Sequence, residues 1–138
     1  MTTHVVDASS LLLSIKRYGD QATETLKTSS TIPLVYYEIG NALKTSATHL
    51  EYITPQEAQN TLRNLHKILE LVEITRQENT QDSEMILENS LKHGLSYYDS
   101  AYLTAAQKHL ANLVTEDKRL ARTAREAGIK TRTASDLE

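Results

Sequence analysis

The chain has 138 residues, of which 39% are hydrophobic and 24% are charged, and its formal net charge is −3. This length fits one domain, residues 1–138, and the composition excludes a disordered chain, while the charge argues against nucleic-acid binding through bulk electrostatics alone. Cysteine is absent, which excludes disulfides, cysteine zinc sites and thiol nucleophiles.

In the first half of the chain, short β-branched runs alternate with helical patterns. Proline at position 33 is compatible with the start of a strand, because no hydrogen-bond donor is needed there. The predicted elements are, in order, a strand at 4–6, a helix from Ser9, a break at 18–20, a short helix at 21–26, a strand at 32–35 and a helix at 38–43.

The second half opens with the clearest helix signal. Thr54 is placed to cap a helix, Pro55 suits its first turn, and Glu57 completes the spacing of a capping box. The elements predicted after residue 54 are a helix to about 69, a strand at 72–74, a helix at 82–93 stopped by Gly94, a helix capped by Ser96, a strand at 113–114, a helix at 118–127 closed by Gly128, a strand at 130–133 and a short tail at 134–138.

This alternation of strands and helices predicts an α/β domain with a mainly parallel sheet and helices on both of its faces. No apolar run approaches the roughly 20 residues that span a bilayer, and the N-terminus lacks the pattern of a secretory signal. We therefore expect a cytoplasmic protein.

Acidic residues follow three of the apolar runs directly. Asp7 comes after Val5-Val6, Glu38 after 34–35, and Asp117 after 113–114. Because ligands bind at the carboxyl ends of parallel strands, we expect these three side chains to share one crevice. Asp99 lies in the first turn of a helix and reaches the same crevice if that helix starts nearby.

Each acid taken singly is better explained as a helix cap, since carboxylates are favoured at helix N-termini. Asp99, for example, lies three residues after Ser96, which is the spacing of a capping box. Several carboxylates in one crevice would repel one another, however, and a divalent cation removes that cost. Oxygen-only ligation selects Mg²⁺ or Mn²⁺.

Four segments together resemble the motifs of PIN-domain proteins, in the order of that family and over nearly the whole chain. They are Val5-Val6-Asp7-Ala8-Ser9, Tyr37-Glu38-Ile39-Gly40-Asn41-Ala42-Leu43, the run from Tyr97 to Ala106 around Asp99, and Leu113-Val114-Thr115-Glu116-Asp117-Lys118-Arg119-Leu120. Each motif alone is weak, but all four in order are a fairly specific signal.

The resemblance implies a three-layer α/β/α sandwich and cleavage of RNA that depends on Mg²⁺ or Mn²⁺. By motif, it implies that Asp7, Glu38, Asp99 and Asp117 are catalytic metal ligands or their water-bridged supports. Ser9 and Thr115 match the small hydroxyl positions beside the first and last acids, and Asn41 matches a polar position one turn after the glutamate. Short chains of this kind resemble VapC-type toxins, the endoribonuclease half of type II toxin–antitoxin pairs, which are inhibited by an antitoxin protein and usually form homodimers.

Other residues and functions need separate consideration. Glu116 adds an acid beside Asp117, and we expect it to face solvent. Lys118 and Arg119 could contact the RNA backbone, although a solvated helix face is the slightly better interpretation. The five histidines show no ligand spacing. Apolar surface for a homodimer could come from helices near 11–13 and 62–69, but core packing explains those leucines equally.

Related chemistries fit less well. A haloacid-dehalogenase-like phosphatase would need a second aspartate where Ser9 stands, and phosphate-binding glycine motifs are absent. The principal alternative is a catalytically inactive PIN-like module that binds a protein partner. A broken acidic set would favour that alternative, whereas the set here is complete.

Overall fold

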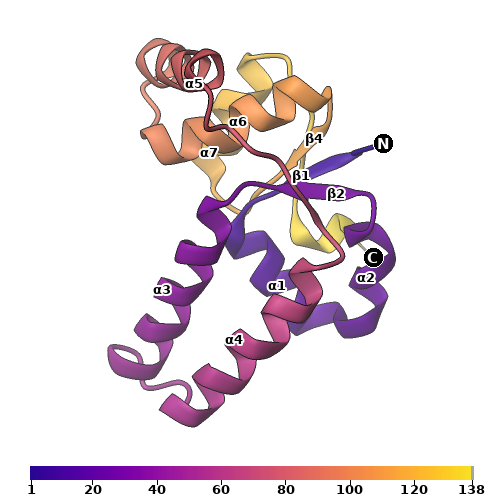
Figure 1. Ribbon diagram of the computed structural model, residues 1–138, viewed down its shortest axis with the longest axis vertical. Coiled ribbons are helices and arrows are strands. Elements are labelled where there is room, and N and C mark those ends of the chain that lie inside the picture. Colours follow the sequence, from indigo (N-terminus) through magenta and orange to yellow (C-terminus); the bar gives the residue numbers. More distant parts are fainter. Residues whose placement is uncertain (138) are drawn as a thin grey trace.

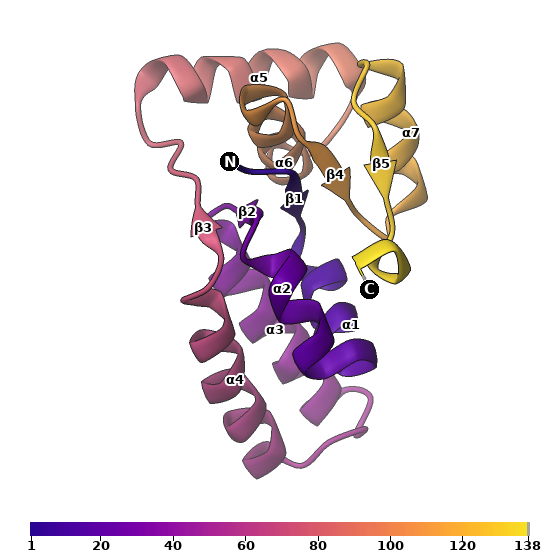
Figure 2. The ribbon, with the colours of Figure 1, turned by 90° about the vertical axis from the view of Figure 1, so that its right-hand side faces the viewer.

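The computed structural model describes residues 1–137, and a parallel β-sheet runs through their centre (Figure 1, Figure 2). Its strand order is β3-β2-β1-β4-β5, and every neighbouring pair is parallel. This confirms the α/β class and extends the prediction, because the sheet in this part of the chain is wholly parallel. The strands are β1 (His4–Val6), β2 (Ser29–Thr31), β3 (Glu73–Ile74), β4 (Asn112–Val114) and β5 (Thr131–Arg132).

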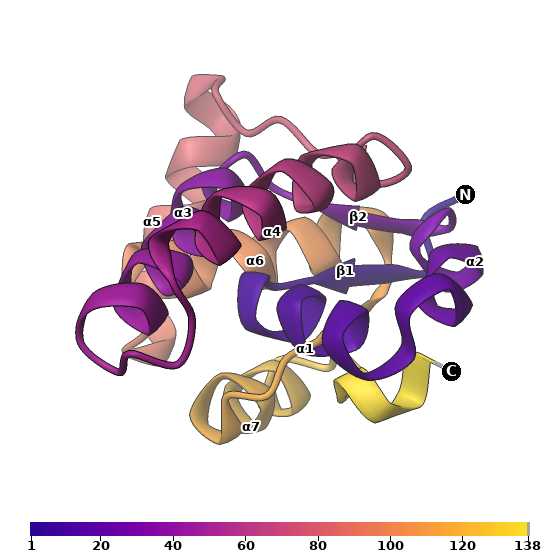
Figure 3. The same cartoon turned by 90° about the horizontal axis from the view of Figure 1, so that it is seen from below.

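Helices cover both faces of the sheet, as predicted. In Figure 1, α5, α6 and α7 lie above it and α1 to α4 below it, and Figure 3 shows the lower group in front when the molecule is seen from below. In residues 1–137, no helix combines the length and apolar character needed to cross a membrane. The helices are α1 (Ala8–Tyr18), α2 (Ala22–Leu26), α3 (Leu34–Thr48), α4 (Pro55–Leu69), α5 (Thr80–His93), α6 (Tyr97–His109) and α7 (Lys118–Glu126), with the 3₁₀ helices η1 (Gly19–Gln21) and η2 (Ala134–Leu137).

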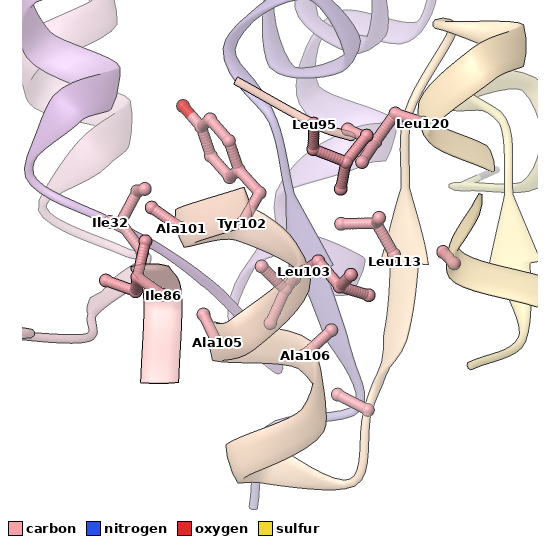
Figure 4. Packing of buried hydrophobic residues seen from close by; sticks show 13 residues of the cluster. Ile32, Ile86, Leu95, Ala101, Tyr102, Leu103, Ala105, Ala106, Leu113 and Leu120 are labelled. Atoms are coloured by element: carbon pink, nitrogen blue, oxygen red, sulfur yellow. The ribbon is translucent and has the colours of Figure 1, made fainter. Parts of the chain in front are cut away.

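Each face of the sheet has its own hydrophobic cluster, because successive strand residues point to opposite faces. In β1, Val5 belongs to the cluster under α5, α6 and α7, and Val6 belongs to the cluster under α1 to α4. Leu113 and Val114 divide in the same way in β4. Figure 4 shows the first cluster, in which Tyr102 carries its hydroxyl away from the labelled leucines. The result is a three-layer α/β/α arrangement.

The second strand was predicted at the wrong place. It occupies Ser29–Thr31, whereas Leu34 and Val35 of the predicted strand belong to α3. The strand is polar in sequence but buried, and its hydroxyls are satisfied internally: Thr31 Oγ1 donates to the Val6 carbonyl at 2.7 Å and Ser30 Oγ to the Glu73 carbonyl at 3.0 Å. A search for apolar runs overlooks such a strand. Glu38 therefore lies inside a helix and not directly after a strand.

The C-terminal segment was also predicted incorrectly. Instead of a free tail, residues 134–137 form η2, and Leu137 is fully buried in the cluster under α1 to α4. The other element boundaries agree with the predictions within a few residues. The capping box of α4 at Thr54 and Glu57 and the left-handed stop of α5 at Gly94 are confirmed.

The sheet reverses its winding between β1 and β4. From β1 the chain adds β2 and then β3 on one side, and β4 and β5 on the other. In open α/β sheets the crevice at the carboxyl ends of strands beside such a reversal is the usual ligand site. Asp7 directly follows β1, and Asp117 lies three residues after the end of β4.

Candidate acidic active site

A cavity of about 280 Å³ lies at the carboxyl ends of β1 and β4. All four acids singled out in the sequence line it, although they come from four separate segments of the chain. Leu12, Ala42 and Tyr102 complete much of its wall, and no basic side chain is among its lining residues. The four carboxylates are Asp7, Glu38, Asp99 and Asp117.

Asp7 is the most deeply placed of the acids, with 7% of its surface exposed. It caps the N-terminus of α1, where its Oδ1 accepts hydrogen bonds from the Ser10 amide at 2.9 Å and from the Ser9 hydroxyl at 3.2 Å. Burial raises the pKa of the Asp7 carboxyl, against the opposing effect of hydrogen bonds from its neighbours. Its Oδ2 takes part in neither of these bonds.

Asp117 occupies the equivalent position on α7. Its Oδ1 accepts from the amides of Arg119 at 2.9 Å and Leu120 at 3.0 Å, which makes it the helix cap. Its own amide donates to Thr115 Oγ1 at 3.1 Å, so the buried threonine fixes the turn between β4 and α7. Asp7 and Asp117 thus each use one carboxylate oxygen to hold a helix and present the carboxylate group to the same cavity.

Glu38 reaches the cavity from the second turn of α3. Its Oε1 accepts a 2.6 Å hydrogen bond from the hydroxyl of Tyr102 on α6. Burial raises the pKa of the Glu38 carboxyl, and the nearby charges of Asp7 and Asp99 raise it further, while the tyrosine hydrogen bond lowers it. Burial together with the bond to Glu38 also raises the pKa of Tyr102, so its hydroxyl stays protonated and acts as a donor.

Asp99 lies in the first turn of α6. Its amide donates to the Ser96 hydroxyl at 3.0 Å, as expected for a helix capped by Ser96. Its carboxylate nevertheless lines the cavity. Burial raises the pKa of this carboxyl, the charges of Asp117 and Asp7 raise it further, and Arg119 and the Ser96 hydroxyl oppose the shift. The charge of Asp7 therefore reaches both Glu38 and Asp99.

The donor set of the cavity fits a hard divalent cation. It offers carboxylate oxygens, its acids raise one another's pKa, and a bound cation would remove that repulsion. As the side chains of residues 1–137 stand, no three histidine, aspartate or glutamate groups are close enough to hold one ion. Ligation by three of them would therefore require side-chain rotation.

The remaining candidate residues take different positions. Ser9 lines the cavity, and Thr115 lies just beneath Asp117. Asn41 is exposed on α3 and is not among the lining residues. Glu116 has an exposed side chain, as expected, and its Oε1 accepts from the Ala134 amide at 2.6 Å, so it caps η2 and does not line the acidic cavity.

The sequence prediction missed Tyr102, whose buried ring lines the cavity and whose hydroxyl binds Glu38. A signal for it exists in the sequence. Residues three apart on a helix share a face, so a tyrosine three residues after Asp99 points to the same side as that acid.

Comparison with known proteins agrees with this site and fold. The chain is 30% identical over 122 residues to Ribonuclease VapC3 of Pyrobaculum aerophilum. The aligned region covers 85% of this chain and 91% of the relative. The crystal structure of PAE2754 from the same organism matches with a TM-score of 0.81 at 24% identity, over 99% of this chain and 93% of the other. The crystal structure of FitAcB from Neisseria gonorrhoeae matches with a TM-score of 0.64 at 12% identity, over 96% of this chain and 99% of the other.

The family model that matches is that of the PIN domain, and it aligns with residues 5–126. This range contains all four acids of the cavity, the strands β2, β3 and β4, and β1 except for His4. The two solved structures support the same fold, and the curated relative supports the same family. The chain belongs to the PIN-domain family.

Proposed function

We propose that this protein is an endoribonuclease that hydrolyses RNA phosphodiester bonds with the help of Mg²⁺ or Mn²⁺. The observation that carries the proposal is the convergence of four carboxylates from four segments on one cavity with no basic lining residue. The name of the curated relative, a ribonuclease, supports the same activity. Asp7, Glu38, Asp99 and Asp117 are the residues that would hold the cation.

When bound, the cation supplies a Lewis acid that makes a water molecule more acidic and offsets negative charge on the phosphate. The work of the chain is to hold the carboxylates. Backbone amides at the starts of α1 and α7 fix Asp7 and Asp117 through one oxygen each. The hydroxyl of Tyr102 fixes Glu38 in the same manner, so one oxygen of each of these three carboxylates is oriented by the fold. Ser9 and Thr115 support the first and last acids, and Asn41 is proposed as a more distant polar support.

A local basic surface supports RNA as the substrate despite the net charge of −3. The segment 118–132 carries six basic residues and one acid, and all six are exposed. The ion pairs within residues 1–137 involve none of the six. Exposed cations without an ion-pair partner in the described residues suit a phosphate backbone, and the first two of them, Lys118 and Arg119, directly follow Asp117 of the acidic cavity. We call this surface the basic strip: Lys118, Arg119, Arg122, Arg125, Lys130 and Arg132.

The biological role follows from the family as a further proposal. We propose that residues 1–138 form one domain that acts as the toxin of a type II toxin–antitoxin system, as a homodimer that a cognate antitoxin protein inhibits. Of the leucines considered for a dimer surface in the sequence, Leu11, Leu65 and Leu69 are buried in the core, whereas Leu12, Leu13 and Leu62 are half-buried.

The proposal is tested by incubating purified protein, free of antitoxin, with mixed RNA in Mn²⁺, in Mg²⁺ and in EDTA. Cleavage should require the metal and disappear in Asp7→Asn, whose side chain still caps α1 but carries no charge. Asp20→Asn is the matched control, because Asp20 is exposed and lies outside the cavity lining. If neither cleavage nor calorimetric Mn²⁺ binding occurs, the catalytically inactive binding module is the better account.

A further inference from the structure

A second cavity, of about 230 Å³, lies at the start of α6. Tyr97 and Tyr98 line it with 42% and 62% of their surfaces exposed, while Ile32, Ile86 and Ala101 are buried beneath. We call it the tyrosine cavity. Exposed aromatic rings over a buried apolar floor make a concave surface that can accept a flat apolar group.

Helix α6 places the tyrosine cavity next to the acidic cavity. Tyr98 and Ala101 line the tyrosine cavity, and the residues that follow them, Asp99 and Tyr102, line the acidic one. Successive residues of a helix are about 100° apart, so these two pairs form adjoining faces of the same helical turn. The two cavities are therefore separated only by the width of this turn.

Helix α3 forms the opposite wall of both cavities. Leu34 lines the tyrosine cavity, and Glu38, one helical turn later, lines the acidic cavity. The hydrogen bond from Tyr102 to Glu38 joins the two helices where the cavities meet. A polynucleotide bound with one phosphate at the carboxylates would thus have a neighbouring nucleotide beside Tyr98.

We infer that the tyrosine cavity binds an unpaired nucleobase next to the phosphodiester bond that is cut. This inference rests on the proposed ribonuclease function and assigns to it a base-binding site beside the acidic cavity. Aromatic side chains stack on exposed bases without strong sequence preference, and a base held in a duplex cannot be splayed onto them. Glu78 and no basic residue line the cavity, which favours a base over a phosphate as its occupant.

One polar residue at the rim is held in place. Gln77, in the segment between β3 and α5, donates from Nε2 to the carbonyl oxygen of Ala101 at 2.9 Å. Its amide is thereby oriented at the cavity, where a base edge could meet it. A stacking platform with an oriented amide beside it matches the way in which unpaired bases are held.

The first test measures kcat/KM in Mn²⁺ on a labelled single-stranded RNA of mixed sequence. Tyr98→Ala should lower it roughly tenfold, mainly through KM, because stacking on one aromatic ring is worth about a factor of ten or more per base. Tyr98→Phe keeps the ring and should restore cleavage to within about twofold. Tyr52→Ala, which removes another exposed tyrosine that lines a different cavity, should match the wild type.

The second test locates the base directly and does not depend on cleavage. Single-stranded RNA containing 5-iodouridine is bound to the wild-type protein in EDTA and irradiated, and crosslinked peptides are identified by mass spectrometry. Crosslinks at Tyr97 or Tyr98 support the inference. Crosslinks elsewhere, or unchanged kcat/KM in Tyr98→Ala while the wild type cleaves RNA, overturn it and leave the nuclease proposal intact. Absence of metal-dependent cleavage in the wild type contradicts the nuclease proposal itself.

Discussion

The hydroxyl of Tyr102 lies 2.6 Å from Oε1 of Glu38 and joins α6 to α3 at the edge of the acidic cavity. Residues 64 positions apart in the chain are thus connected by one charge-assisted hydrogen bond. The tyrosine is otherwise a core residue, 1% exposed, so the hydrophobic cluster under α6 holds the hydroxyl in position.

We expect Tyr102→Phe to retain the fold and to impair the site. Loss of the hydrogen bond should raise the pKa of Glu38, because that bond now lowers it. The acid limb of the pH profile of RNA cleavage should therefore move to higher pH, with lower activity than the wild type on that limb. The free energy of unfolding should fall by about 1 kcal/mol. An unchanged pH profile would contradict the orienting role.

The two capping aspartates allow the structural and chemical roles of a carboxylate to be separated. Asp117→Asn retains an oxygen that can accept hydrogen bonds from the amides of α7. The free energy of unfolding of this variant should therefore stay within about 0.5 kcal/mol of the wild type. Its Mn²⁺-dependent cleavage of RNA, by contrast, should fall severely. Asp117→Ala should lose the same activity and about 1 kcal/mol of stability in addition. Full activity in Asp117→Asn would mean that this acid serves only as a cap.

Without metal, the protein should become less stable as the pH rises above about 4. The pKa values of Asp7, Glu38 and Asp99 are raised in the folded state, so the folded chain binds more protons than the unfolded chain between the ordinary and the raised pKa values. This stabilising contribution is present below the ordinary values and is lost as the pH passes through the raised ones.

Urea unfolding at pH 5 and pH 7.5 in EDTA measures this effect. The wild type should lose more stability between the two pH values than Glu38→Gln, which cannot ionise at this position. Mn²⁺ should raise the melting temperature more at pH 7.5 than at pH 5, because it competes with protons for the carboxylates. Equal Mn²⁺ effects at both pH values would argue against ligation by these acids.

The basic strip should contribute to RNA affinity in a salt-dependent way. Arg122→Glu and Arg125→Glu should each weaken RNA binding, and each should reduce the slope of log affinity against log salt by about 0.7 to 1, the value for one lost phosphate contact. Lys27→Glu is a suitable control, since Lys27 lies outside the strip and is already paired with Glu24. Its Nζ lies 2.8 Å from Oε1 of that glutamate. Slopes that match the control would remove the strip from the binding surface.

The sequence was most informative for site residues whose positions depend on neighbouring residues in the chain. Asp7 and Asp117 each follow a short apolar strand, and the rule for parallel sheets was sufficient to bring both to one edge. Glu38 was assigned to the correct crevice for an incorrect reason, because the apolar residues before it belong to a helix. Its place in the cavity comes from the way α3 leaves β2, which is a tertiary feature.

Other features depend on partners that are distant in sequence. The segment Ser29–Thr31 resembles a loop in composition. It is a strand because β1 and β3 lie on either side of it and their backbone carbonyls accept hydrogen bonds from its hydroxyls. The burial of Leu137 likewise depends on helices more than a hundred residues earlier in the chain. No local pattern predicts either feature.

The order of the strands also bears on how the protein is made. The acids come from residues 7 to 117, and β4, which carries the chain toward the last of them, pairs with β1 at the middle of the sheet. During synthesis the N-terminal strand can pair early with β2, but its partner on the other side, β4, lies more than one hundred residues later in the chain. A nascent chain that has not yet reached Asp117 therefore lacks a complete acidic set, so the proposed nuclease would become competent only after Asp117 has been synthesised.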